Sequence, residues 1–84
     1  MEKVSNMLLE LSDIRIDLDN YPYPKERIEP ASLVGLSNSL VTEGMEYPVL
    51  VRKYQDEYHL IHGYRRYFAV QALGWPGILV DIIT

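Results

Sequence analysis

The sequence predicts a single α+β domain with a small mixed β-sheet and two main helices. Three observations lead to this fold class. Short apolar and β-branched runs bounded by turn residues indicate strands. Two longer segments place apolar residues at helical spacing and end at glycine, and a nearly all-apolar run closes the chain. With 84 residues, 48% of them hydrophobic, the chain is expected to form one domain over 1–84.

The first half of the chain predicts a strand, a loop and a helix. Residues 14–19 alternate apolar and charged side chains, which is typical of a half-buried strand. Residues 20–30 contain three prolines and are expected to form an irregular connection that covers a site. A helix is predicted from about Ala31 to Glu43, because leucines recur along one face and Gly44 supplies a C-terminal cap.

The second half predicts a hairpin, a second helix and a closing strand. The hairpin joins Pro48–Lys53 to Tyr58–His62 across a short polar turn. The second helix runs from about Tyr64 to Leu73, where Gly74 ends it. The closing strand, Ile78–Ile83, is so apolar that we expect it to be buried on both faces.

Composition excludes several classes of function. The chain has no cysteine, which rules out disulfides, thiolate metal sites and thiol catalysis. Its net charge of −4 argues against a general nucleic-acid coat, although four of the eight basic residues fall between Arg52 and Arg66. No apolar run approaches the length of a membrane span, so a soluble, cytoplasmic protein is expected.

The most informative segment is His62-Gly63-Tyr64-Arg65-Arg66, where a predicted strand turns into a helix. Free backbone N–H groups and the positive end of the helix dipole meet at such a junction and attract anions. Glycine lets the backbone approach a ligand, and the two arginines supply forked, permanently charged donors suited to phosphate. The segment therefore predicts a phosphate or nucleotide pocket, with the histidine as a further donor.

Each of these residues also has a structural interpretation. Arginines on the inward face of a first helical turn would alternatively form an internal ion pair, for instance with Asp81 or Asp17. His62 would alternatively be a hydrogen-bonded structural residue, and His59 is expected on the surface. No cluster of carboxylates accompanies the two histidines, so no metal ligand and no catalytic residue is assigned.

The aromatic residues also have two interpretations, as ligand contacts or as core residues. Several tyrosines are candidates for stacking on a nucleotide ring or for completing the core: Tyr21, Tyr23, Tyr47, Tyr64 and Tyr67. Trp75 is expected to be a core plug or the rim of an interface. Three acidic residues are expected on the solvated face of a strand: Asp13, Asp17 and Asp19.

The segments Gly44–Arg52 and Tyr58–Ala69 together resemble the ParB/sulfiredoxin superfamily. Gly44–Arg52 is similar to the family's G-x-x-x-P-[IV]-x-V-R pattern, and Tyr58–Ala69 is similar to its Y-x-L-I-x-G-E-R-R-x-x-A box. Ala72–Trp75 and the closing strand match the continuation of that pattern. The resemblance covers roughly Leu8–Ile83, and the order of the two patterns makes it specific.

This resemblance implies a ParB/sulfiredoxin-like fold in which the box is a phosphate-binding turn. The family uses that turn for CTP in partition proteins and for ATP in sulfiredoxins, so CTP or ATP with Mg²⁺ is the implied ligand. By position, Gly63, Arg65 and Arg66 inherit the phosphate role. Arg27 resembles the arginine of the family's N-P-x-x-P-R segment and is expected to reach the site from the loop.

The sequence departs from the family pattern in ways that bear on activity. Tyr64 stands in place of the usual Glu, and also of the reactive Cys of sulfiredoxins, so sulfinic-acid reduction is excluded. The later Glu-Asn segment, which helps to hold Mg²⁺ and triphosphate, and the helix-turn-helix module that reads DNA are not among these 84 residues. Efficient hydrolysis and direct DNA recognition are therefore not expected of them.

The leading hypothesis is a stand-alone ParB-like module that binds a nucleotide or another phosphate ligand and acts as a switch or docking domain. Its expected partners are that ligand and a protein partner or second copy, with DNA contacted indirectly or through a partner. One alternative is a ParB-like nuclease or phosphotransferase, which the lack of convincing metal ligands disfavours. The other is a structural or regulatory domain with a vestigial pocket, which Tyr64 supports.

Overall fold

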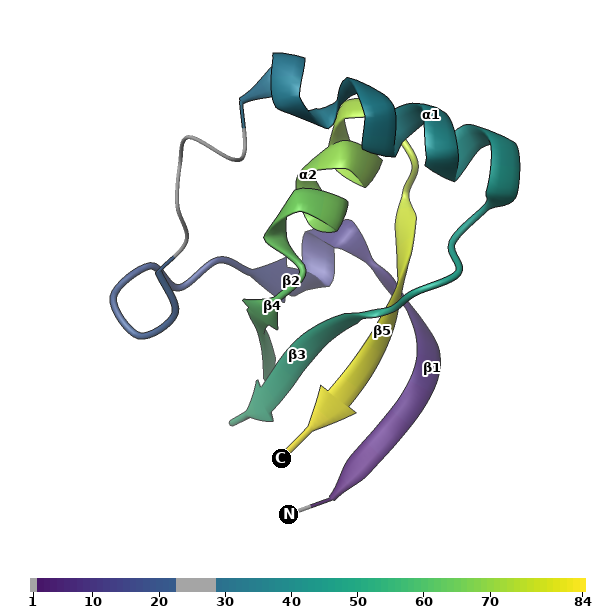
Figure 1. The fold of residues 1–84 in the computed structure, drawn as a ribbon. Helices are drawn as coiled ribbons and strands as arrows, with labels where there is room; N and C mark the ends of the chain where they lie inside the picture. The colour runs from purple at the N-terminus through teal and green to yellow at the C-terminus, as the bar shows by residue number, and fades with distance from the viewer. Residues whose placement is uncertain (1, 23–28) are drawn as a thin grey trace.

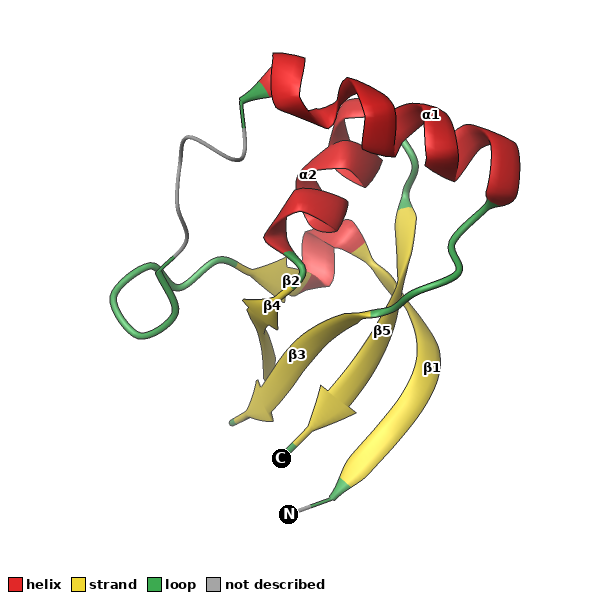
Figure 2. Cartoon of the chain, in the orientation of Figure 1, coloured by secondary structure: helices red, strands yellow, loops and turns green. Residues whose placement is uncertain are grey.

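The structure, a computed structural model, describes residues 2–22 and 29–84. It confirms the α+β fold, since in this part of the chain two α-helices lie on one side of a five-stranded mixed sheet (Figures 1 and 2). The elements follow in this order: β1 (Lys3–Glu10), the 3-10 helix η1 (Leu11–Asp13), β2 (Ile14–Arg15), the 3-10 helix η3 (Pro30–Leu33), α1 (Val34–Glu43), β3 (Val49–Tyr54), β4 (Glu57–His62), α2 (Tyr64–Ala72) and β5 (Gly77–Ile83).

The sheet has the strand order β1-β5-β3-β4-β2. Strands β3 and β4 form the antiparallel hairpin, and α2 then carries the chain across to β5, which pairs parallel with β3. Strand β1 pairs antiparallel with β5 at one edge, and β2 pairs parallel with β4 at the other. The two ends of the chain therefore lie close together, as Figure 1 shows.

The predicted hairpin is confirmed, with a turn of two residues. Gln55 and Asp56 have φ angles of 49° and 65°, so both are left-handed. Two consecutive left-handed residues characterise the tight hairpin turns whose twist matches that of the flanking strands. This turn sets the register in which Val51 lies opposite Leu60.

Both predicted helices are confirmed. The first begins with the 3-10 turn η3 and continues as α1, and the N–H of Gly44 donates to the carbonyl of Leu40 at 2.9 Å to close its end. Helix α2 ends at Ala72, two residues before Gly74, which has a φ of 74°. Trp75 then packs against the core, as the core-plug interpretation predicts.

The N-terminal region corrects the sequence prediction. The strand predicted over 14–19 is wrong: β2 covers two residues, and the long first strand is β1. Most side chains of β1 are exposed, because it is an edge strand, so its sequence lacks the alternation that marks a half-buried strand. Strand β2 ends at Arg15 and a turn follows at 18–20, where the carboxylate of Asp17 accepts hydrogen bonds from the backbone and side chain of Asn20 at 3.3 and 2.9 Å.

The core lies between the helices and the sheet face turned toward them. Its fully buried residues come from β3, β4, α2 and β5, the largest being Leu60, Ile78, Val49, Val51, Val70 and Val80. The prediction that β5 is buried on both faces is wrong. Its residues alternate between buried and half-buried, because among the described elements the helices cover one face of the sheet.

Candidate functional site

The start of α2 provides the geometry of an anion site. Gly63 precedes the helix with φ 94° and ψ 29°, and no side chain in the described part of the chain caps this terminus. The N–H groups of the first turn point away from the helix without helical carbonyl partners, and the positive end of the helix dipole lies there. Such a terminus favours a negatively charged oxygen.

Arg65 lies on the surface beside this terminus. Its Nη2 donates to the carbonyl oxygen of Ser32 at 2.7 Å, which ties α2 to the 3-10 turn before α1. The prediction of an inward-facing arginine is wrong for this residue, because its side chain is exposed. One guanidinium edge is used in that bond, and a guanidinium carries further donors.

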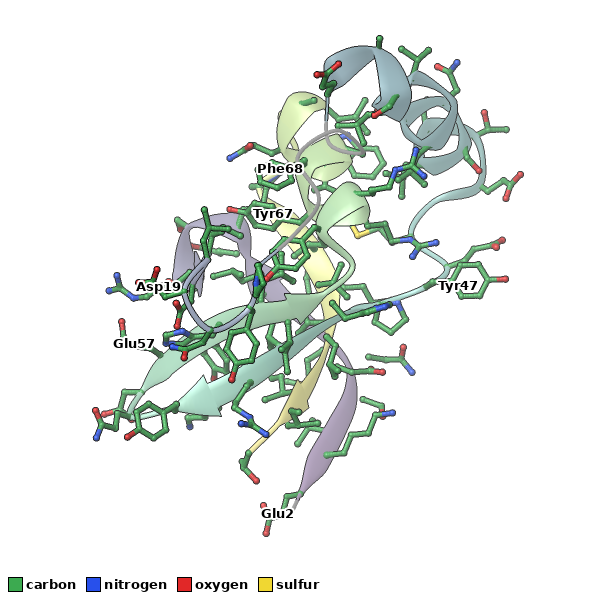
Figure 3. The ribbon with its side chains drawn as sticks, turned by 60° about the vertical axis from the view of Figure 1, so that its left-hand side comes forward. Glu2, Asp19, Tyr47, Glu57, Tyr67 and Phe68 are labelled. Atoms are coloured by element: carbon green, nitrogen blue, oxygen red, sulfur yellow. The ribbon has the colours of Figure 1, made fainter. Side chains whose placement is uncertain are left out.

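Arg66 turns to the other side of the helix terminus. Its guanidinium carbon lies 5.1 Å from the centre of the Tyr47 ring, a cation–π contact. The two side chains line a hollow of about 60 Å³ together with Glu43 and Glu46 of the α1 end and the following loop. Tyr47 projects outward from that loop (Figure 3) and is 62% exposed. The two arginines therefore flank the helix start without converging on one point.

The ion pairs considered as alternatives for these arginines do not form. Asp81 is paired with Lys3, whose Nζ lies 3.6 Å from its carboxylate. Asp17 lies 3.4 Å from Nδ1 of His59. The interpretation of the arginines as internal ion-pair partners of these aspartates is therefore wrong.

Tyr64 fastens the preceding chain to the helix terminus. Its hydroxyl oxygen lies 2.5 Å from the carbonyl oxygen of Tyr21 and 2.8 Å from that of Leu60. A hydroxyl has one proton, so it donates to one of these carbonyls at a time. The residue that replaces the family's Glu thus serves as a link between β4, α2 and the segment after β2.

The remaining candidates separate into buried and exposed residues. Tyr67 is buried and contacts the Phe68 ring edge-on at 5.1 Å, so it is a core residue and the stacking interpretation is wrong for it. His62 is exposed at the end of β4, next to the helix start. Arg27 and Tyr23 lie outside the described residues.

His59 is misplaced by the sequence prediction. It is expected on the surface, but its side chain is only 19% exposed and lies near Asp17 and Glu57. Within the described residues, no group of three or more histidine or acidic side chains is arranged for a metal ion. The first turn of α2 carries no acidic residue, and the carboxylates that line the hollow beside Arg66 are those of Glu43 and Glu46.

The sheet order, the hairpin and the glycine-arginine turn into α2 define a ParB/sulfiredoxin-like domain. The model of the family described as the ParB N-terminal domain matches residues 2–84. This chain belongs to that family.

One curated relative is the nucleoid occlusion protein of Oceanobacillus iheyensis, which is 41% identical over 71 residues. The match covers 77% of this chain and 25% of the relative. The chain thus spans about a quarter of the length of a protein named for nucleoid occlusion.

Solved structures share the fold. The C-terminally truncated chromosome-partitioning protein ParB from Caulobacter crescentus, complexed with CTP-γ-S, has a TM-score of 0.73 and 26% identity over 95% of this chain and 43% of that chain. Sulfiredoxin from Arabidopsis thaliana has a TM-score of 0.69 and 28% identity over 90% of this chain and 83% of that chain. Both likenesses confirm the ParB/sulfiredoxin-like fold. In the described residues, no helix has the length and apolar character to cross a membrane.

Proposed function

We propose that this domain binds the phosphate end of a nucleotide of the CTP or ATP class where Gly63 leads into α2. The observation that carries the proposal is the uncapped start of α2 with an arginine on either side. A phosphate oxygen would accept hydrogen bonds from the first-turn N–H groups. The bound state would act as a switch or a docking signal, without rapid turnover.

Four of the predicted site residues would contact the phosphate in this arrangement. Arg65 has free donors beside its bond to Ser32 and would contact the phosphate at the surface. Arg66 would reach the phosphate by leaving the Tyr47 ring, an exchange of a weak contact for a charge-assisted one. His62 would donate from the end of β4, and Arg27 would reach in from the loop.

The nucleoside would extend over the surface beyond the helix start. The hollow beside Arg66 measures about 60 Å³, well below the roughly 300–1,000 Å³ of pockets that enclose a small molecule. The exposed Tyr47 ring at its rim offers a face for a base. The described residues therefore favour a phosphate-anchored ligand over an enclosed one.

The described carboxylates beside Arg66 are those of Glu43 and Glu46, and neither belongs to the helix start that would bind the phosphate. Mg²⁺ is usually held by one or two carboxylates together with substrate phosphates, and the first turn of α2 has none. In our proposal the arginines and backbone N–H groups balance the phosphate charge. Slow or absent hydrolysis follows, because little remains to activate a water.

The proposed readout is a protein–protein contact near DNA. Relatives are named for nucleoid occlusion, and a structural neighbour was solved with its centromeric parS site. We infer that this domain would engage a DNA-associated partner or a second copy in the cytoplasm, with no direct reading of DNA. Its net charge of −4 supports an indirect role.

A vestigial pocket is the second candidate, and a specific observation favours it. Both arginines already have partners within the fold, Ser32 for Arg65 and Tyr47 for Arg66. The Tyr64 hydroxyl also bridges toward two carbonyl oxygens in the same region. In this case the turn would hold the helices in place, and the domain would serve as an interaction module without a ligand.

Binding measurements distinguish the two candidates. CTP, ATP, GTP and inorganic phosphate are titrated calorimetrically and by thermal shift into the wild type, Arg65→Ala and Arg15→Ala. Arg15 is the matched control, because it is an exposed arginine of β2 that is paired with Glu57 of β4. A ligand that binds the folded state raises its Tm.

We expect Arg65→Ala to weaken nucleotide binding about ten- to a hundredfold, with the control unchanged. The vestigial pocket would be correct if none of the four ligands moved the wild-type Tm. Equal losses of nucleotide affinity in Arg65→Ala and Arg15→Ala would show that binding depends on general charge attraction.

A further inference from the structure

A separate cavity lies on the sheet face turned away from the helices. It has a volume of about 350 Å³ and is lined by Asp17, Asn20, Tyr21, Arg52, Tyr54 and His59. Arg52 and His59 lie opposite each other in the register of β3 and β4. Their neighbours Val51 and Leu60 are buried under the helices, so the alternation of a strand turns Arg52 and His59 to the other face.

Two nitrogen atoms of residues that line this cavity are buried without a hydrogen-bond partner. They are Nε of Arg52 and Nε2 of His59, and neither has a hydrogen bond to the described residues. Arg52 also forms no ion pair with any described carboxylate. Buried polar groups in native proteins are nearly always paired with protein, water or a ligand. The two atoms therefore lack the partners that buried polar groups usually have.

The nearby carboxylates do not fill this role. The carboxylate of Asp17 accepts two hydrogen bonds from Asn20, the main reason that its pKa lies below its usual value. It also faces Nδ1 of His59 at 3.4 Å, which leaves Nε2 at the far side of the ring. Glu57 is paired with Arg15, and its other oxygen stays 3.9 Å from Nε2 of His59. The positive charge of Arg52 therefore has no carboxylate partner among the described residues.

We propose that this cavity binds a small organic oxyanion, a carboxylate or a phosphate monoester. One ligand oxygen accepts a hydrogen bond from the Nε–H of Arg52, and the ligand also lies against Nε2 of His59, whose Nδ1 faces Asp17. The body of the ligand contacts the rings of Tyr21 and Tyr54. The volume falls within the roughly 300–1,000 Å³ of small-molecule pockets. This site is distinct from the start of α2, which lies on the helix side of the sheet.

The test uses the full chain labelled with ¹⁵N, with the Nε–Hε signal of Arg52 and the ring signals of His59 as reporters. Acetate, benzoate, inorganic phosphate and phenyl phosphate are titrated, with sodium chloride at matched ionic strength as the reference. We expect saturable shifts of both residues. The aromatic ligands should bind about threefold tighter or better than the bare anions, because ring contacts with tyrosine add to the charge. The head group that binds more tightly shows whether the cavity prefers a carboxylate or a phosphate.

The variant Arg52→Lys keeps the charge but removes the buried Nε–H, so we expect binding to weaken at least about tenfold. Arg15→Lys is the control, since Arg15 is exposed and paired with Glu57. If Arg52→Lys does not fold, the wild-type titration decides alone. Shifts that stay linear and match those of chloride would overturn the proposal. So would a crystal grown in benzoate that shows only a water between the two nitrogens.

Discussion

A Cβ atom built on Gly63 would lie 2.7 Å from Cγ1 of Val49 and 3.2 Å from its Cα. Val49 is fully buried at the start of β3, so it has no room to withdraw. The φ of Gly63, 94°, is also one that side-chain-bearing residues rarely adopt. The fold itself therefore requires glycine before α2, whether or not a ligand approaches.

Gly63→Ala is expected to lower the free energy of unfolding by about 2–4 kcal/mol, from backbone strain and overpacking against Val49. Urea denaturation followed by circular dichroism measures it. Gly35→Ala is the matched control, because Gly35 lies in α1 with open space around its Cβ position. That change should be neutral or stabilise by up to about 1 kcal/mol. Equal effects of the two changes would contradict the packing argument.

Removing the Tyr64 hydroxyl should loosen the link between β4, α2 and the segment after β2. Tyr64→Phe loses the hydrogen bond toward the Tyr21 and Leu60 carbonyls, at a cost of about 0.5–1.5 kcal/mol. Hydrogen exchange should show faster opening around Tyr21. The control is Tyr54→Phe, whose ring is 60% exposed. A Tyr64→Phe protein as stable as wild type would show that the bridge is not used in solution.

The turn after β2 should make the stability of the fold depend on pH in the acid range. Hydrogen bonds from Asn20 hold the pKa of Asp17 below its ordinary value. Because the pKa of Asp17 is lower in the folded state, its carboxylate stabilises the fold at a pH above the pKa of the unfolded state. This stabilisation is lost as the pH falls through the pKa of the folded state. Asn20→Ala should raise the Asp17 pKa toward its usual value, measured by carboxyl ¹³C NMR. An unchanged pKa would assign the effect to another group.

At alkaline pH, the ionisation of Tyr67 tests its burial in the core. Burial raises the pKa of the Tyr67 phenol above its ordinary value of 10.0. The neutral Tyr67 phenol therefore contributes fully to the stability of the fold below the pKa of the unfolded state. This stability is lost as the pH rises through the pKa of the folded state. Absorbance at the phenolate band should show Tyr67 ionising last, together with unfolding, and Tyr67→Phe should remove this step. Ionisation in the folded protein at the pH of free tyrosine would contradict the buried placement.

The sequence predicts well where local rules decide the structure. The second helix and the hairpin are set by glycines, turn residues and apolar spacing, and both are found close to the expected residues. Strand β1 is missed because its side chains are exposed and carry no alternation. The short length of β2 depends on hydrogen bonds between Asp17 and Asn20, which a simple alternation pattern does not report.

The site is predicted only in part, because contacts between distant segments decide it. Consecutive residues point about 100° apart around a helix, so Arg65 and Arg66 separate toward η3 and the Tyr47 loop. Their partners lie more than a dozen residues away in sequence and carry no local signal. His59 is assigned to the surface for the same reason, since the turn that covers it follows a different strand.

The central claim is that a phosphate lies against the backbone N–H groups at the start of α2. The most direct measurement is a ¹H–¹⁵N titration of the wild-type chain with CTP and with inorganic phosphate, reading the amides of Tyr64, Arg65 and Arg66. Our account predicts saturable downfield shifts of these amides, as expected when an N–H donates to a charged oxygen. Saturation without a shift at these three amides, or no saturable change at all, would contradict it.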